Sequence, residues 1–307
     1  MNLATTEKGT DIAHISEQYQ EIQKNACRII EENDGKGKFS EQKWNKDIGF
    51  GITRVMQNGS FIEKAAINFS HVSGKYKPQM ARMAGKSGET FAATGVSSIM
   101  HPFNPHAPVI HMNIRYFELN NGQRWFGGGI DLTPHYVDKK EAAYFHSQLK
   151  KLCDSFDIQY YTKFKPWADD YFFLQHRNET RGIGGIFFDL LEPADDQEME
   201  KLFHFTSELG KLYPLLYSEL FTKKSTLPFT KEEKEWQLLR RGRYAEFNLI
   251  YDRGTKFGLE SNGNTESILV SLPPQANWTY NYQAKPNSRE IETLQLLKKD
   301  IDWIKLA

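Results

Sequence analysis

The feature that most limits the fold of this chain is a series of short β-like segments that follow one another without an intervening helix. Between residues 47 and 133, apolar or alternating stretches are separated by glycine, proline and asparagine. Strands that succeed one another without helical crossovers usually pair as antiparallel neighbours. The series therefore predicts a large, mainly antiparallel sheet. Its expected strands are residues 48–57, 64–71, 91–100, 108–119 and 124–132.

Helical periodicity flanks this series. Apolar residues at steps of three and four predict helices at residues 11–32, 138–156, 166–177, 195–223 and 231–241. Asp138 and Glu141 have the spacing of a capping box, and Pro166 fits the first turn of its helix. Further strands are expected at residues 183–191, 244–252 and 266–272. These elements predict an α+β fold, in which helices flank the sheet, as a single domain over residues 1–307 with a loose tail at residues 1–10.

The composition argues against several classes of protein. Lys and Arg number 39, as do Asp and Glu, so the formal net charge is zero and gives no indication of a nucleic acid or an anionic membrane as partner. No apolar run approaches the roughly 20 residues of a transmembrane helix, and the N-terminus lacks the apolar segment of a secretory signal. Cys27 and Cys153 form no CxxC pair, so we expect reduced thiols in a cytoplasmic protein.

One expected strand, residues 109–117, carries unusual polar residues. Side chains alternate between the two faces of a strand, so His111, Asn113 and Arg115 share one face. A solvent-exposed face would explain three polar side chains, although such faces usually carry Lys, Glu and Thr. An imidazole, a carboxamide and a guanidinium in a row also suit the binding of an anion and the movement of a proton. The alternating apolar residues are expected on the core face: Ile110, Met112, Ile114 and Tyr116.

A glycine-rich stretch leads into the carboxylate of Asp131. The three glycines at residues 127–129 match neither GxGxxG nor a P-loop, so they do not indicate a nucleotide site. A bulge or a tight bend would explain them structurally, and close approach of the backbone to a ligand would explain them functionally. Because Asp131 follows directly among apolar neighbours, it is a candidate catalytic residue.

Histidines and arginines supply further candidates. A histidine on an apolar helix face is more often a core residue than a ligand, and the histidine spacings match no compact metal motif. The arginines at residues 177, 181, 240, 241, 243 and 253 could pair with surface acids, or together they could bind a polyanionic small molecule. Four histidines are candidate ligands of one metal ion: His101, His111, His146 and His176.

Several blocks of the sequence resemble oxygen-dependent coproporphyrinogen III oxidases. The similar blocks occur in order from about residue 45 to residue 282. They include INFSHV (67–72), GVSS (95–98), HPFNP (101–105), HMNIRYF (111–117), WFGGGIDLTP (125–134), WADDYFFLQHR (167–177), RGIGGIFFD (181–189), residues 240–260 and residues 265–273.

The resemblance implies an activity and an assembly. Members of that family convert the propionates on rings A and B of coproporphyrinogen III to vinyl groups. Dioxygen is the co-substrate, and the products are protoporphyrinogen IX, carbon dioxide and hydrogen peroxide in haem biosynthesis. The resemblance further implies no organic cofactor, a large sheet sandwiched between helices, and a homodimer with residues 244–279 at its interface. A metal-dependent hydrolase and a non-catalytic tetrapyrrole carrier are competing interpretations.

The resemblance also implies roles for individual residues. Asp131 would accept hydrogen bonds from pyrrole N–H groups and help to deprotonate one, and His111 would act as proton donor. In some members His101, His111, His146 and His176 correspond to a divalent-metal set, for example for Mn²⁺, whereas other members need no metal. The sequence departs from the family at Asn264, where an arginine is usual. The expected substrate-binding residues are Ser97, Asn113, Ile114, Arg115, Asn262, Gly263 and Asn264.

Overall fold

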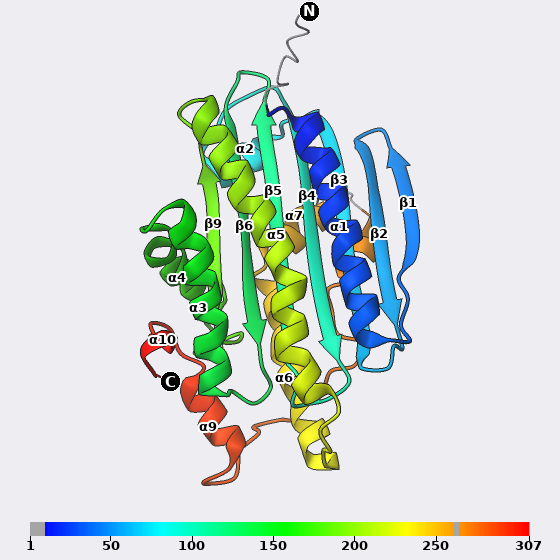
Figure 1. Ribbon diagram of the computed structural model, residues 1–307, viewed down its shortest axis with the longest axis vertical. Coiled ribbons are helices and arrows are strands. Elements are labelled where there is room, and N and C mark those ends of the chain that lie inside the picture. The colour runs from blue at the N-terminus through cyan, green and yellow to red at the C-terminus, as the bar shows by residue number, and fades with distance from the viewer. Residues whose placement is uncertain (1–9, 261–263, 307) are drawn as a thin grey trace, which may run out of the picture.

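A seven-stranded sheet, antiparallel throughout, forms the centre of the computed structural model, which describes residues 10–260 and 264–306 (Figure 1). The predicted tail at residues 1–10 lies almost wholly outside this range. The strand order is β1-β2-β3-β4-β5-β6-β9. The strands are β1 (Ser40–Lys46), β2 (Gly49–Gln57), β3 (Ile62–Lys75), β4 (Thr90–Pro102), β5 (Val109–Leu119), β6 (Arg124–Thr133) and β9 (Gly185–Leu191).

Helices lie on both faces of this sheet. One face is covered by α1 (Ile12–Asp34), α3 (Lys139–Phe156) and α5 (Asp196–Ser225), and the other by α6 (Lys231–Ile250) and α7 (Arg253–Glu260) (Figure 1). The predicted α+β sandwich is therefore confirmed. The β1 strand was not predicted, because its sequence SEQKWNK is polar and largely exposed at the sheet edge.

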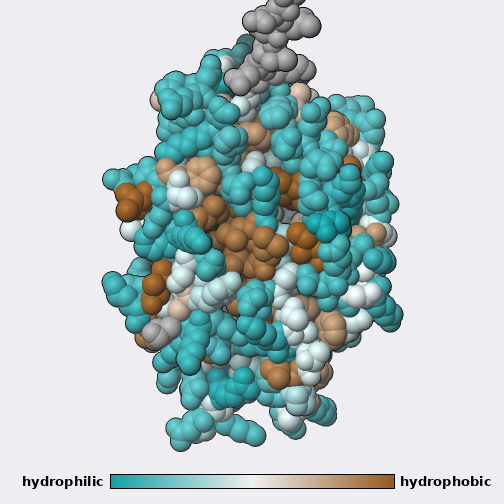
Figure 2. Space-filling view, viewed as in Figure 1, coloured by the Kyte–Doolittle hydropathy of each residue, from teal (hydrophilic) through white to brown (hydrophobic). Residues whose placement is uncertain are grey.

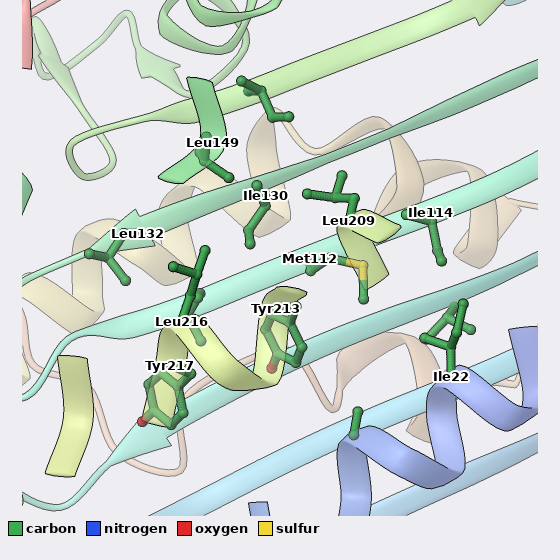
Figure 3. Close-up of a cluster of buried hydrophobic side chains, with 14 of the residues drawn as sticks. Ile22, Met112, Ile114, Ile130, Leu132, Leu149, Leu209, Tyr213, Leu216 and Tyr217 are labelled. Atoms are coloured by element: carbon green, nitrogen blue, oxygen red, sulfur yellow. The ribbon is translucent and has the colours of Figure 1, made fainter. Parts of the chain in front are cut away.

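The main core lies between the sheet and the helices α1, α3 and α5. Figure 3 shows Met112 and Ile114 of β5 beside Leu209 of α5 and Ile22 of α1. All four predicted core residues of β5 are at most 1% exposed. A Cβ at Gly210 would lie 2.9 Å from side-chain atoms of Ile114 and Ile22, so the glycine lets α5 approach the sheet closely.

Shorter elements complete the fold, and the core cluster extends from Ile15 to Trp303, close to the end of the described chain. The shorter elements are α2 (Pro78–Ala84), α4 (Tyr160–Tyr171), β7 (Phe173–Leu174), β8 (Glu179–Thr180), α8 (Thr265–Leu269), α9 (Arg289–Leu296) and α10 (Trp303–Leu306).

The outer surface over α1, α3 and α5 is mainly hydrophilic, with hydrophobic side chains exposed near its middle (Figure 2). Within the described residues, no helix is long and apolar enough to cross a membrane.

Two predicted strands are wrong. Residues 244–252 fall mostly within α6, and residues 266–272 begin in α8. Tyr244 and Phe247 are buried three residues apart, whereas Leu249 and Ile250 are 50% and 45% exposed. This distribution fits one buried face of a helix, and a short apolar stretch cannot distinguish that arrangement from a strand.

The boundaries of α4 also differ from the prediction. The helix begins at Tyr160 rather than Pro166, so the proline lies inside the helix and not in its first turn. The helix ends at Tyr171, and the short strand β7 follows where the helix was expected to continue to residue 177. At α3, the Asp138 carboxylate accepts the N–H groups of Lys140 and Glu141, which confirms the cap at this residue.

Candidate active site

The polar residues of β5 face away from the main core, as the alternation predicts. The sheet register pairs His111 with Asp131 of β6 on one side and Asn113 with Ser97 of β4 on the other. Paired residues on antiparallel strands project to the same face. Three neighbouring strands therefore bring five polar residues together on one face: Ser97, His111, Asn113, Arg115 and Asp131.

A buried ion pair lies at the centre of this face. The Asp131 carboxylate is 1% exposed and accepts a hydrogen bond from the Arg181 Nη2 at 2.6 Å and from the Arg181 Nε at 3.2 Å. The His111 Nδ1 lies 2.9 Å from the Asp131 Oδ1. A carboxylate held side-on by a guanidinium is fixed in both position and orientation. Asp131 in turn fixes the orientation of the His111 ring.

Aromatic side chains enclose the Arg181 guanidinium. Its central carbon lies 4.5 Å from the ring centroids of Phe172 and Tyr244 and 4.6 Å from that of Phe247. The Arg181 Nη1 donates to the Asn248 Oδ1 at 2.8 Å. These contacts offset the cost of removing the Arg181 charge from water, since this residue is only 3% exposed. The sequence placed Arg181 only in a group of arginines, so its pairing with Asp131 was missed.

The electrostatics keep Asp131 ionised. Burial by itself would raise the pKa of Asp131, but the Arg181 charge and the His111 hydrogen bond outweigh it and lower that pKa below its usual value. Burial opposes the charge of Arg181 too, yet the neighbouring Asp131 carboxylate leaves the Arg181 pKa raised. His111 is 23% exposed, and its Nε2 has no hydrogen-bond partner among the described residues. His111 Nε2 is therefore the atom of this cluster that a ligand can reach.

Arg115 provides a second, more exposed cation on the same face. Its Nη1 donates to the Asn113 Oδ1 at 2.9 Å, and its Nη2 lies 2.9 Å from the Asp189 Oδ2 of β9. The side chains of Arg115 and Asp189 are 34% and 23% exposed. An anion that approaches β5 can therefore reach both Arg115 and His111.

The chain that follows α7 covers the neighbouring part of this face. Asn68 of β3 donates to the Ser267 carbonyl at 2.8 Å, and His101 of β4 lies 2.9 Å from the Ser271 carbonyl. Two surface hollows, of about 420 and 580 Å³, lie elsewhere and include no residue of the Asp131 cluster. On the face that carries Asp131, the partly exposed side chains of His111 and Arg115 are the groups that a ligand above β5 can reach.

The remaining predicted binding residues have different positions. Ser97 is partly buried and is paired in register with Asn113, and its role in binding stays a prediction. Ile114 is fully buried against α1 and α5, so its side chain points away from His111 and only its backbone borders the site. Asn264 caps the N-terminus of α8 without a side-chain hydrogen bond. The other two predicted positions, Asn262 and Gly263, lie outside the described residues.

The four predicted metal-ligating histidines do not share a site in this chain. His146 is fully buried, with Nδ1 2.9 Å from the Tyr161 hydroxyl and Nε2 3.0 Å from the Ile183 carbonyl. Burial lowers its pKa to about 3, so the ring is neutral. His101 uses Nε2 to contact the Ser271 carbonyl. Each ring therefore already has its own partners in the fold.

The fourth of these histidines lies on the surface. His176 contacts the Tyr251 hydroxyl and the Glu246 carboxylate, both at 2.8 Å. Residues 10–260 and 264–306 contain no group of three or more His, Cys, Asp or Glu side chains arranged to hold a metal ion. The four predicted histidines therefore do not fit a common coordination sphere within one chain.

Most arginines of the predicted anion-binding group are paired with acids. Among the described residues, Arg253 is the exception of those six, and its guanidinium carbon lies 5.7 Å from the Tyr171 ring centroid. The pairs are Arg177 and Arg243 with Glu246, Arg240 with Glu179, Arg241 with Glu63, and Arg181 with Asp131.

Comparison with known proteins assigns this arrangement to a family. The family model described as coproporphyrinogen III oxidase matches residues 14–303. The chain is 46% identical over 299 residues to the oxygen-dependent coproporphyrinogen-III oxidase of Drosophila melanogaster, covering 92% of this chain and 76% of the relative. It is 42% identical over 308 residues to the enzyme of that name from Prochlorococcus marinus (strain MIT 9301), covering 92% and 90%. The mitochondrial enzyme of that name from Homo sapiens is 45% identical over 300 residues, covering 93% and 65%. The chain belongs to the coproporphyrinogen III oxidase family.

Proposed function

We propose that this chain is an oxygen-dependent coproporphyrinogen III oxidase. It would convert the propionates of rings A and B to vinyl groups and yield protoporphyrinogen IX for haem synthesis. The observation that carries this proposal is the polar face of β5. There the oriented histidine of the His111–Asp131–Arg181 cluster shares one surface with the exposed guanidinium of Arg115.

The overall chemistry defines what the protein must supply. Each propionate side chain loses carbon dioxide from its end and a hydride equivalent from the carbon next to the pyrrole. Dioxygen takes up that hydride equivalent and one proton, and hydrogen peroxide forms. Each step therefore needs a bound carboxylate, access for dioxygen and a proton. The residues on this face can provide the carboxylate-binding group and the proton.

Arg115 is the proposed partner of a substrate carboxylate. A guanidinium binds a carboxylate through paired N–H groups, and Asn113 and Asp189 each contact one terminal nitrogen of Arg115, which carries five N–H groups in all. Asn113 and Ser97 lie beside it at paired positions and offer an amide and a hydroxyl to the same ligand. The three residues together would hold a propionate near His111.

His111 is the proposed proton-transfer group, oriented by Asp131. With the His111 Nδ1 held by the Asp131 carboxylate, the Nε2 faces the ligand. Direct hydrogen bonds from pyrrole N–H groups to Asp131 stay a prediction. They require His111 or Arg181 to move aside, because these two side chains occupy the carboxylate and leave it 1% exposed. No step of this proposal involves a metal ion.

The proposal is tested by aerobic incubation of the purified chain with coproporphyrinogen III. We expect a product with two vinyl groups, detected by chromatography, with about two dioxygen molecules consumed and two hydrogen peroxide molecules formed per substrate. Binding without vinyl formation would instead indicate a tetrapyrrole carrier. Activity that persists without oxygen and is lost on chelation would favour a metal-dependent enzyme.

We also propose a homodimer that uses residues 244–279. Four large apolar side chains of this segment are well exposed in the single chain: Leu249, Ile250, Leu259 and Trp278 at 50%, 45%, 44% and 53%. A monomeric mass in light scattering would contradict this proposal. The single catalytic domain and the cytoplasmic location stay predictions. The human relative is named as a mitochondrial protein.

A further inference from the structure

An irregular point in the sheet lies beside Arg115. The pairing of β6 with β9 changes register between Phe126, which faces Leu191, and Gly128, which faces Phe188. Asp189 and Leu190 together therefore face the single residue Gly127, as in a β-bulge. Bulges are frequent next to functional sites, where they change the direction of a side chain. Here the bulge lies where Asp189 meets Arg115.

The bulge holds its residues in an unusual conformation. Leu190 has a φ of 50°, which is uncommon for a residue with a branched side chain. The Leu190 N–H donates to the Asp189 Oδ1 at 3.0 Å and so fixes the carboxylate. The other oxygen, Oδ2, lies 2.9 Å from the Arg115 Nη2. A strained backbone that persists next to a candidate active site suggests that the position of the Asp189 carboxylate has a function.

Gly127 provides the path by which the two side chains meet. Arg115 starts on β5 and Asp189 on β9, with β6 between them. A Cβ at Gly127 would lie 2.6 Å from the Asp189 Oδ1 and 2.8 Å from the Arg115 Nε and Nη2. Contacts below 3.0 Å force a side chain to move. The side chains of Arg115 and Asp189 can therefore meet over β6 only because residue 127 has no side chain.

We propose that Asp189 is a positioning residue for Arg115 and thereby helps to determine how tightly the substrate carboxylate binds. Asn113 holds one terminal nitrogen of Arg115 and Asp189 the other, from strands on either side of Gly127. A guanidinium anchored at two points loses less conformational freedom when it binds a carboxylate. Asp189 itself does not take part in the reaction. This inference rests on the proposed oxidase activity.

The first test compares Asp189→Ala with the unaltered chain in steady-state turnover of coproporphyrinogen III. We expect KM to rise about tenfold, which corresponds to the loss of one charge-assisted interaction, while kcat stays within about twofold. Asp189→Asn keeps an oxygen but not the charge, and it should give a smaller rise. Binding of coproporphyrin III, measured by tryptophan fluorescence, should weaken in parallel without any need for turnover.

A second test uses Gly127→Ala, which should displace Arg115 from Asp189 by a different route. It should raise KM by a similar factor, and Gly127→Ala combined with Asp189→Ala should raise it no further than either change alone. Glu41→Ala is the matched control, because Glu41 pairs with Arg54 across β1 and β2, away from this face. We expect the control to leave KM unchanged.

The outcomes separate this inference from the proposed activity. If the unaltered chain forms no vinyl product, the proposed activity fails, whatever the variants do. If the unaltered chain is active and Asp189→Ala lowers KM, Asp189 competes with the substrate and the positioning role is wrong. An unchanged KM with a lower unfolding midpoint would show a purely structural role, and it would overturn the inference as well.

Discussion

Replacement of Arg181 by methionine tests the central electrostatic argument. Methionine preserves an aliphatic stem between the three aromatic rings but removes the cation from the buried Asp131 carboxylate. Loss of one partner of a buried ion pair costs about 3–5 kcal/mol. Protonation of Asp131 sets an independent upper limit to this loss of unfolding free energy, because binding a proton removes the unpaired charge. At pH 7, protonation of a group with an unfolded pKa of about 4 costs about 4 kcal/mol, at about 1.4 kcal/mol per pH unit.

The pH dependence distinguishes this cause from a packing defect. In the unaltered chain the folded pKa of Asp131 is lowered, so its contribution to stability is present above about pH 4 and is lost as the pH falls further. In Arg181→Met we expect burial to raise the folded pKa instead, so the variant loses stability as the pH rises above about 4. The difference in unfolding free energy between the two proteins should therefore shrink by about 1.4 kcal/mol per pH unit between pH 7 and pH 5.

Urea unfolding followed by tryptophan fluorescence at several pH values measures this difference. The variant should also melt about 6–10 °C lower at pH 7, at about 2 °C per kcal/mol for a chain of this size. Arg181→Met combined with Asp131→Asn should recover more than half of the loss, because the lone charge is gone. A loss that is the same at pH 5 and pH 7 and is not recovered in the double variant would refute the reasoning.

Three further predictions follow from the same geometry. Asp131→Asn should lower kcat by about 10³- to 10⁴-fold in a protein that still folds but is less stable, because His111 loses the carboxylate that orients it and Arg181 loses its buried partner. Stopped assays and circular dichroism check this, and near-normal turnover would contradict it. Arg115→Lys should raise KM about tenfold, because a lysine cannot bind a carboxylate through paired N–H groups; an unaltered KM would remove Arg115 from the site. Leu190→Gly should raise the unfolding free energy by about 1 kcal/mol, by relief of the positive φ, and leave KM unchanged. A loss of stability in urea unfolding would show that the leucine side chain contributes more than its backbone strain costs.

The histidines and the two mistaken strands show where sequence reasoning stopped. His146 and His176 each contact partners far along the chain, Ile183 and Glu246, which no local pattern predicts. Residues 244–252 carry apolar side chains that suit either a strand or a helix, and only packing against the sheet selects the helix. Asp189 lies on the strand predicted at residues 183–191, but its contact with Arg115 depends on the bulge, which no local pattern predicts.

The sequence by itself determined six of the seven strands of the sheet and the face on which His111, Asn113 and Arg115 lie, because hydrophobic periodicity is a local property and side chains of a strand must alternate. It also determined the family, through blocks that span most of the chain. Only the tertiary structure decided that Arg181, 50 residues further along the chain, neutralises Asp131, and that a bulge directs Asp189 across Gly127 to Arg115. These pairings depend on which strands and loops meet in space. Burial then makes the Asp131–Arg181 pair costly to break, because a charge removed from water must find its partner within the fold.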